Sequence, residues 1–214
     1  VEGFRPTADG GFELTRGIFL RAVDSARKAP DKDVVVVIDE INRGNISKIF
    51  GELLSLIEAD KRNERWSVTL PYSGRDLWLP ENLYILGMMN TADRSISLVD
   101  YALRRRFGFV TVNPGFDRVQ FEILLRSKGV STALIQLIRQ RITSLNQVIV
   151  ESPQLGPGFE IGHSYFIPED GLINSENDRD WFNRVVRYEI KPLLTEYWFD
   201  DLSTAEELTA SLLR

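Results

Sequence analysis

The 214-residue sequence contains no cysteine and only one histidine, His163. Without cysteine there are no disulfide bonds and no thiolate metal sites, and a lone histidine excludes a metal centre built from several imidazoles. No apolar run approaches the ~20 residues that a helix needs to cross a bilayer. The sequence begins at Val1 without a signal-peptide pattern. We therefore expect a cytoplasmic protein with no membrane association.

A broadly basic surface is also absent, because 31 acidic residues outnumber 26 basic ones and the net charge is -5. A wide face for nucleic acid is therefore not expected, although local basic clusters remain compatible with one. Apolar residues make up 43% of the chain and charged residues 27%, as in ordinary globular proteins. The length suffices for one large domain or two small ones.

The first half of the chain has the pattern of an α/β fold. The expected elements are helices at 14–29, 46–59 and 97–104, strands at 34–38, 83–88 and 107–112, and a hairpin at 66–79. Strands that alternate with helices predict a parallel sheet. The unbroken β-branched run Val34–Ile38 predicts a strand that is buried on both faces.

The second half has only helical periodicity. Asn113-Pro114-Gly115 interrupts the pattern, and the expected helices after it are 117–127, 131–149, 180–199 with a kink at Pro192, and 203–213. We therefore predict two domains, an α/β domain over 1–114 and a helical domain over 115–214.

Two adjacent carboxylates, Asp39 and Glu40, follow the first predicted strand. Ligands of parallel sheets bind beyond the carboxyl ends of the strands. One carboxylate at such an end can hold Mg²⁺ and the next can orient or deprotonate an attacking water. The same pattern also fits a strand that ends in a solvated turn.

Asn90 follows the second buried strand, where its neutral amide can hold a water without adding charge near a phosphate. Asn90-Thr91 is also typical of a turn or a helix cap, and in isolation that interpretation is favoured.

Three arginines, Arg104 to Arg106, directly precede the last predicted strand. Guanidinium groups bind phosphate oxygens in a forked geometry, while a basic cluster also suits the end of a helix dipole.

Together these segments resemble AAA+ motors, and more closely the McrB-type GTPase subunits of modification-dependent restriction systems. The stretch Met89–Ser95 (MNTADRS) is the most diagnostic, and Gly44 stands where such proteins often have alanine. The other matching segments are DEINRGN at 39–45, DYALRRRF at 100–107 and GHSYF at 162–166. The resemblance runs over essentially the whole chain and implies a P-loop NTPase sheet followed by an α-helical lid.

The resemblance also implies roles for these residues. Asp39 would position Mg²⁺, Glu40 would activate water, and Asn90 would orient that water. Asp93 and Arg94 would shape a nucleotide-site loop that a partner protein touches.

Among the arginines, the resemblance implies an arginine finger, which contacts the nucleotide of a neighbouring subunit. Arg105 is the first candidate, Arg106 the second and Arg104 the third. His163 and Ser164 would contact the base or a phosphate, although a histidine bonded within the lid is at least as good an interpretation.

One expected element is missing from the sequence. No Gly-x-x-x-x-Gly-Lys-Ser/Thr occurs, the Walker A loop whose backbone amides and lysine hold the phosphates. In the proteins that this chain resembles, the Walker A strand lies between the strand before Asn90 and the strand after the arginines. Its absence predicts a gap beside Leu83–Met88 and exposed sheet edges.

The resemblance implies Mg²⁺ and GTP, or ATP, as cofactors. The implied partners are other copies in a ring, expected to be a hexamer, an McrC-like nuclease subunit, and DNA through the full complex. GTP hydrolysis would then drive DNA translocation and cleavage. Two alternatives stay open: a MoxR-like or other AAA+ ATPase, and a non-catalytic assembly piece that lacks Walker A.

Overall fold

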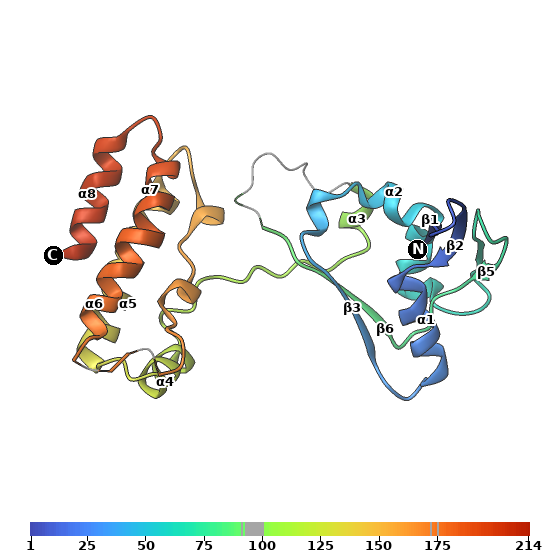
Figure 1. The fold of residues 1–214 in the computed structure, drawn as a ribbon, viewed down its shortest axis with the longest axis horizontal. Helices are drawn as coiled ribbons and strands as arrows, with labels where there is room; N and C mark the ends of the chain where they lie inside the picture. Colours follow the sequence, from blue (N-terminus) through green and yellow to red (C-terminus); the bar gives the residue numbers. More distant parts are fainter. Residues whose placement is uncertain (91, 93–100, 172, 175) are drawn as a thin grey trace. The chain divides into compact units, whose positions relative to one another are not determined.

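The computed structural model describes residues 1–90, 92, 101–171, 173–174 and 176–214. The chain forms two compact units, 1–109 and 110–214, each with its own hydrophobic core (Figure 1). The division predicted after residue 114 lies within 107–115, which has no regular secondary structure. Over the described ranges, no helix has the length and apolar character that a membrane span requires.

A hairpin precedes the first helix. Strand β1 (Glu2–Pro6) pairs antiparallel with β2 (Phe12–Arg16), and helix α1 (Ile18–Lys28) follows. The prediction of a helix from residue 14 was wrong at its start, because Leu14 lies in β2 opposite Phe4. Pairing with β1 satisfies the backbone of this segment, so the helix begins only after the hairpin closes.

The centre of the first unit is a two-stranded parallel sheet. Strand β3 (Val34–Ile38) pairs with β6 (Leu83–Gly87) in register from Val34 opposite Leu83 to Ile38 opposite Gly87. Helix α1 contacts both strands. The side chains that the sheet contributes to the core are those of Val34, Val36, Ile38, Leu83 and Ile85.

The opposite face of this sheet is exposed. Val35, Val37, Tyr84 and Leu86 alternate with the core residues, and each is 50–55% exposed. The prediction that Val34–Ile38 is buried on both faces was therefore wrong, and Leu83–Gly87 is likewise buried on only one face. The β-branched run forms the expected strand, but in the described part of the chain only one of its faces packs in the core.

Residues 107–112 do not form the predicted third strand. Val110 and Val112 are each 87% exposed. A strand needs a neighbour for its backbone hydrogen bonds, and the Walker A strand that the resemblance places beside this segment is absent from the sequence. The β-branched pattern alone therefore does not impose a strand here.

The helix predicted over 46–59 is split. Helix α2 (Ile46–Phe50) is followed by the 3₁₀ helices η2 (Gly51–Ile57) and η3 (Ala59–Lys61). Gly51 has a φ of +49°, a left-handed backbone that an α-helix cannot contain. The prediction that this segment turns its regularly spaced apolar side chains to the core is confirmed in part, because Phe50, Leu53 and Ile57 are buried.

The hairpin predicted over 66–79 is present with shorter strands. Strand β4 (Val68–Thr69) pairs with β5 (Asp76–Leu77), and Gly74, with a φ of +66°, lies in the turn. The described part of the next predicted helix is α3 (Tyr101–Arg104).

The second unit is helical, as predicted. Its elements are α4 (Val119–Ser127), α5 (Thr132–Glu151), η4 (Pro157–Phe159), η5 (His163–Phe166), α6 (Asp178–Val185), η6 (Val186–Ile190), α7 (Lys191–Tyr197) and α8 (Leu202–Leu213). The irregularity predicted at Pro192 takes the form of the π-helical segment η6. Pro192 has no N–H, so the carbonyl of Tyr188 lacks its α-helical donor.

We predict that the 214-residue chain by itself self-associates through the exposed face of the β3–β6 sheet, because uncovered apolar faces and strand edges invite pairing. Val37→Lys combined with Leu86→Lys should raise the monomer fraction in sedimentation velocity experiments. Val36→Lys, on the covered face, is the matched control and should unfold the chain instead. A wild-type chain that stays monomeric and melts cooperatively would contradict this prediction.

Candidate functional site

The structure brings two of the predicted strand ends together. Beyond the last paired residues of β3 and β6, the amide of Met88 donates to the carbonyl of Ile38 at 2.9 Å, and the amide of Ile41 donates to the carbonyl of Met88 at 2.9 Å. Backbone pairing therefore continues past both strands. Asp39-Glu40 and Asn90 follow from the same edge of the sheet, the edge where ligands of α/β sheets bind.

Glu40 has an unusual backbone. Its φ of 49° and ψ of 43° are left-handed, and it is the one non-glycine residue with a positive φ in the described part of the chain. Its amide donates to Oδ1 of Asp39 at 2.9 Å. Such a conformation costs about 1 kcal/mol or more and is concentrated at functional sites.

The Glu40 carboxylate also has a partner. Its Oε2 lies 3.2 Å from Nε of Arg43, and both side chains are about half exposed. An ion pair this open to solvent contributes little stability, so it does not prevent the carboxylate from taking another partner.

Asn42 links the two strand ends and was not among the predicted site residues. Its Nδ2 donates to the backbone carbonyl of Asn90 at 3.3 Å. Its Oδ1 is buried and has no hydrogen-bond partner among the described residues. The signal was present in the sequence, since Asn42 belongs to the DEINRGN segment, but spacing alone reveals no role for an amide in the single-turn 3₁₀ helix η1 (Ile41–Arg43).

The side chain of Asn90 makes a local hydrogen bond. Its Oδ1 accepts from the amide of Ala92 at 3.1 Å, a bond that asparagine side chains often form close to their own position in the sequence. The water-orienting role of Asn90 stays a prediction, as do the roles of Asp93 and Arg94, which lie outside the described residues.

The three arginines are in different environments. Nη2 of Arg106 lies 2.8 Å from Oε1 of Glu58, and the Arg106 side chain is only 18% exposed. Arg104 and Arg105 are exposed. Lys61 hydrogen-bonds the same Glu58 carboxylate and, with Arg106, holds its pKa below the usual value. The assignment of Arg105 as the first candidate for the finger stays a prediction.

In the second unit, His163 is bound to backbone. Its Nδ1 accepts from the amide of Gly115 at 3.0 Å. Its ring meets Phe116 and Phe121 edge-on, with centroids 6.2 and 5.9 Å apart. Because Nδ1 is the acceptor, the ring carries its proton on Nε2. Ser164 is exposed beside it. A nucleotide contact by either residue stays a prediction, and for His163 only Nε2 is left for it.

Asn146 holds the His163 segment in place. Its Nδ2 donates to the carbonyl of Ile161 at 3.0 Å, and its Oδ1 accepts from the amide of Ile161 at 2.7 Å. Asn146 is 5% exposed and lies on α5. A buried amide that satisfies both backbone groups of one residue fixes that residue against the helix, which places Gly162 and His163 next to it.

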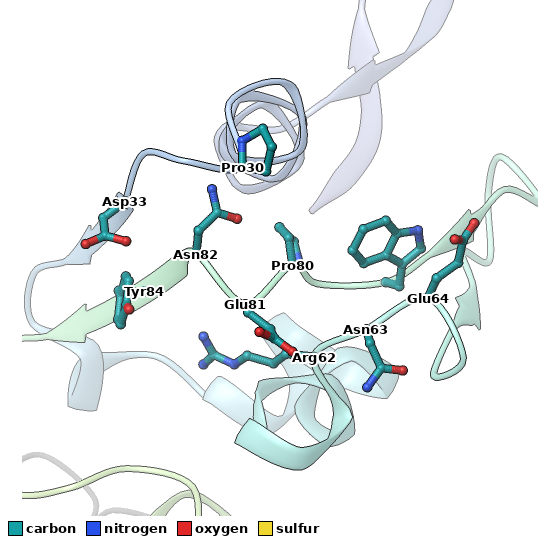
Figure 2. Close-up of a pocket in the computed structure, with 10 residues that line it drawn as sticks. Pro30, Asp33, Arg62, Asn63, Glu64, Pro80, Glu81, Asn82 and Tyr84 are labelled. Atoms are coloured by element: carbon teal, nitrogen blue, oxygen red, sulfur yellow. The ribbon is translucent and has the colours of Figure 1, made fainter.

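A hollow of about 520 Å³ is lined by Asp33 and Asn82, the residues directly before β3 and β6, and by Arg62 (Figure 2). It therefore lies at the opposite end of the two strands from Asp39 and Asn90. Its lining includes Arg62 and Asn82, whose donors bind backbone carbonyls. The remaining charged lining side chains are the carboxylates of Asp33, Glu64 and Glu81. Negative charge does not suit a triphosphate, so this hollow is not a candidate nucleotide site.

Two family models match the chain. Residues 1–107 match an AAA domain of the dynein-related subfamily, and residues 137–206 match the α-helical lid domain of McrB. The chain is also 47% identical, over its whole length, to the "Type IV methyl-directed restriction enzyme EcoKMcrB subunit" of Escherichia coli. The chain belongs to the McrB family. Its fold is therefore an AAA domain followed by the McrB lid, as the resemblance implied.

A more distant relative is the "Type II restriction enzyme BsuMI component YdiS" of Bacillus subtilis, 26% identical over 99% of the chain. The chain spans 47% of the length of the E. coli protein and 62% of the B. subtilis protein. It therefore corresponds to about half of the curated McrB relative.

We predict that His163→Phe destabilises the lid by about 1–3 kcal/mol, because the phenyl ring keeps the aromatic packing but leaves the buried Gly115 amide without an acceptor. His163→Asn is the matched control, since its Oδ1 lies near the position of Nδ1 and should preserve most of the stability. Urea unfolding followed by tryptophan fluorescence measures both, because Trp181 and Trp198 lie in the lid core. Equal stability of the phenylalanine variant and the wild type would contradict the role of this hydrogen bond.

Proposed function

We propose that this chain supplies the hydrolytic and trans-acting side of a GTPase site in an McrB-type ring motor. The observation that carries the proposal is the side-by-side placement of Asp39-Glu40 and Asn90 at the carboxyl ends of two paired parallel strands. Acidic groups at one strand end and an amide at the next suit the γ-phosphate of a nucleotide and its attacking water.

The donor set fits a magnesium ion. Mg²⁺ is usually held by one or two carboxylates together with substrate phosphates and waters, and does not require a cage of protein ligands. Asp39 would provide that carboxylate, and the bound ion would neutralise charge on the phosphates. Glu40 would accept a proton from the attacking water, and Asn90 would orient that water. Asn42 would keep Asn90 at a fixed distance from the Asp39-Glu40 turn.

In trans, Arg105 would reach the nucleotide of a neighbouring subunit, with Arg106 and Arg104 as the other candidates. Asp93 and Arg94 would shape the loop that a partner protein touches, and His163 and Ser164 of the lid would lie near the base or phosphates. Residues 1–114 would act as the AAA+ α/β subdomain and 115–214 as the lid.

The whole protein would assemble as a ring, expected to be a hexamer, and act in the cytoplasm with an McrC-like nuclease subunit. GTP hydrolysis would drive DNA translocation and cleavage by that complex. Support comes from the 47% identity to a restriction enzyme subunit. The match to the McrB lid favours this proposal over a MoxR-like ATPase.

A second candidate function rests on the sequence without a Walker A loop. Most ground-state phosphate contacts of a P-loop protein come from that loop and its lysine. The chain by itself would then be an assembly piece that provides Glu40 and the arginines to a site whose phosphate-binding side comes from other sequence.

Glu40→Gln in the full-length protein should reduce GTP turnover by at least about 100-fold, the usual effect of losing a general base. GTP binding should remain, because the amide has the same shape and Asp39 still provides the magnesium ligand. Steady-state phosphate release and binding of a fluorescent GTP analogue measure the two properties. Unchanged turnover would refute the role of Glu40. Asp33→Asn, a carboxylate at the other end of β3, is the control.

Nucleotide titration separates the two candidate functions. With Mg²⁺ present, the 214-residue chain should bind a fluorescent GTP analogue no more tightly than about millimolar, because the amides of a phosphate loop are lacking. The full-length protein should hydrolyse GTP faster than ATP. Micromolar binding by the chain alone would refute the assembly-piece proposal, and faster ATP hydrolysis would refute the GTPase assignment.

A further inference from the structure

Arg106 differs from its two neighbours in the arginine run. It is bound to Glu58 at 2.8 Å with its side chain only 18% exposed, whereas Arg104 and Arg105 are exposed. Three identical side chains in succession therefore have two different environments. One guanidinium is occupied within its own subunit, and two remain accessible to another molecule.

Glu58 is itself held firmly. It lies between η2 and η3, directly after Leu56 and Ile57, which are each 2% exposed. One of its carboxylate oxygens binds Arg106 and the other binds the ammonium group of Lys61. Both oxygens are therefore used by cations of this unit.

Arg62 ties the Glu58 segment to the central sheet. Its Nε donates to the carbonyl of Ile57 at 3.0 Å, and its Nη1 donates to the carbonyl of Leu83, the first residue of β6. Partial burial lowers the pKa of Arg62, but a guanidinium stays charged at neutral pH. Arg62 thus joins Leu83 to Ile57, the residue directly before Glu58, and Glu58 in turn binds Arg106.

The turn that carries the arginines is fixed on its other side by the core. The amides of Arg106 and Phe107 both donate to the carbonyl of Leu103, at 2.9 and 3.1 Å. Leu103 is 6% exposed, and Phe107 packs against the same core. Arg105 therefore projects from a short turn that is anchored by the Leu103 side chain before it and by Arg106 and Phe107 after it.

We propose that the Glu58–Arg106 ion pair is a positioning device that aims Arg105 at the neighbouring subunit, so that Arg106 is an anchor and not a second finger. This inference rests on the proposed function, because it gives a purpose to a trans-acting arginine. A guanidinium that stabilises a transition state must be placed accurately, and a displacement of about 1 Å costs on the order of 100-fold in rate. A long side chain on an exposed turn needs a rigid base for such placement.

The test uses the full-length protein with GTP and Mg²⁺. Arg105→Ala should reduce kcat by on the order of 1,000-fold, as expected for a lost finger. Glu58→Ala and Arg106→Ala should each reduce kcat by roughly 10- to 100-fold with KM for GTP unchanged, because the finger is present but misplaced. The matched control is Asp24→Asn on α1, which breaks the ion pair of Asp24 with Arg16 of β2 and should leave kcat unchanged.

A charge swap separates an anchor from a finger. The triple variant Glu58→Arg, Lys61→Glu and Arg106→Glu reverses the three charges of the two Glu58 ion pairs and keeps both attractions, but it has no guanidinium at position 106. If Arg106 is an anchor, this variant should recover most of the kcat that Arg106→Ala loses. If Arg106 contacts the nucleotide, the triple variant stays as inactive as Arg106→Ala, and the proposal is overturned.

Mixed rings show whether Glu58→Ala lowers kcat at the site of the neighbouring subunit. Glu58→Ala subunits keep an intact Glu40, and Glu40→Gln subunits keep a correctly placed Arg105. Mixing the two should restore turnover wherever Arg105 of a Glu40→Gln subunit faces the site of a Glu58→Ala subunit. No recovery would mean that Glu58 acts within its own site or on folding, and would contradict the proposal. Ring assembly by size-exclusion chromatography checks the folding of each variant.

The alanine variants distinguish a failure of the trans-acting role from a failure of the positioning role. If Arg104→Ala, Arg105→Ala and Arg106→Ala all keep wild-type turnover, the proposed trans-acting role of the arginines is wrong. If Arg105→Ala is inactive while Glu58→Ala and Arg106→Ala behave as wild type, the finger stands and only the positioning device is refuted.

Discussion

Parallel pairing of β3 with β6 is the constraint on which the candidate site depends. Two strands that run in the same direction end at the same edge, so the polar residues that follow them are brought together although they are distant in sequence. The backbone bonds of Met88 and Ile41 extend this pairing past the strands. After β3, the left-handed backbone of Glu40 turns the chain, and the side-chain amide of Asn42 then binds the carbonyl of Asn90.

The β3–β6 sheet has one covered and one exposed face. The core of the first unit is formed on one side of β3 and β6, while Val35, Val37, Tyr84 and Leu86 lie open. The lid buries its helices around Phe166, Phe182 and their neighbours. A helix satisfies its backbone hydrogen bonds internally, whereas a strand depends on its neighbours, so the open sheet face is a feature of the first unit.

Charged groups divide into those used within the chain and those left accessible. Glu58, Lys61, Arg62 and Arg106 bind one another or the backbone and tie the arginine turn to β6. Arg104 and Arg105 remain exposed. This division leaves Arg104 and Arg105 as the members of the arginine run that the proposed trans-acting role would use. Partly buried ion pairs hold geometry better than exposed ones, which suits the first group to positioning.

The sequence by itself determined the family, the two-part organisation into sheet and helical lid, and the candidate residues Asp39, Glu40 and Asn90. Each of these depends on a contiguous motif or on a local periodicity, and a sequence displays both directly. Only the tertiary structure decided which sheet face is covered, that 107–112 is not a strand, and that Asn42, Glu58 and Gly115 are the partners of Asn90, Arg106 and His163. Those outcomes depend on which residues meet after the chain folds, and contacts between distant residues leave no periodic trace in the sequence.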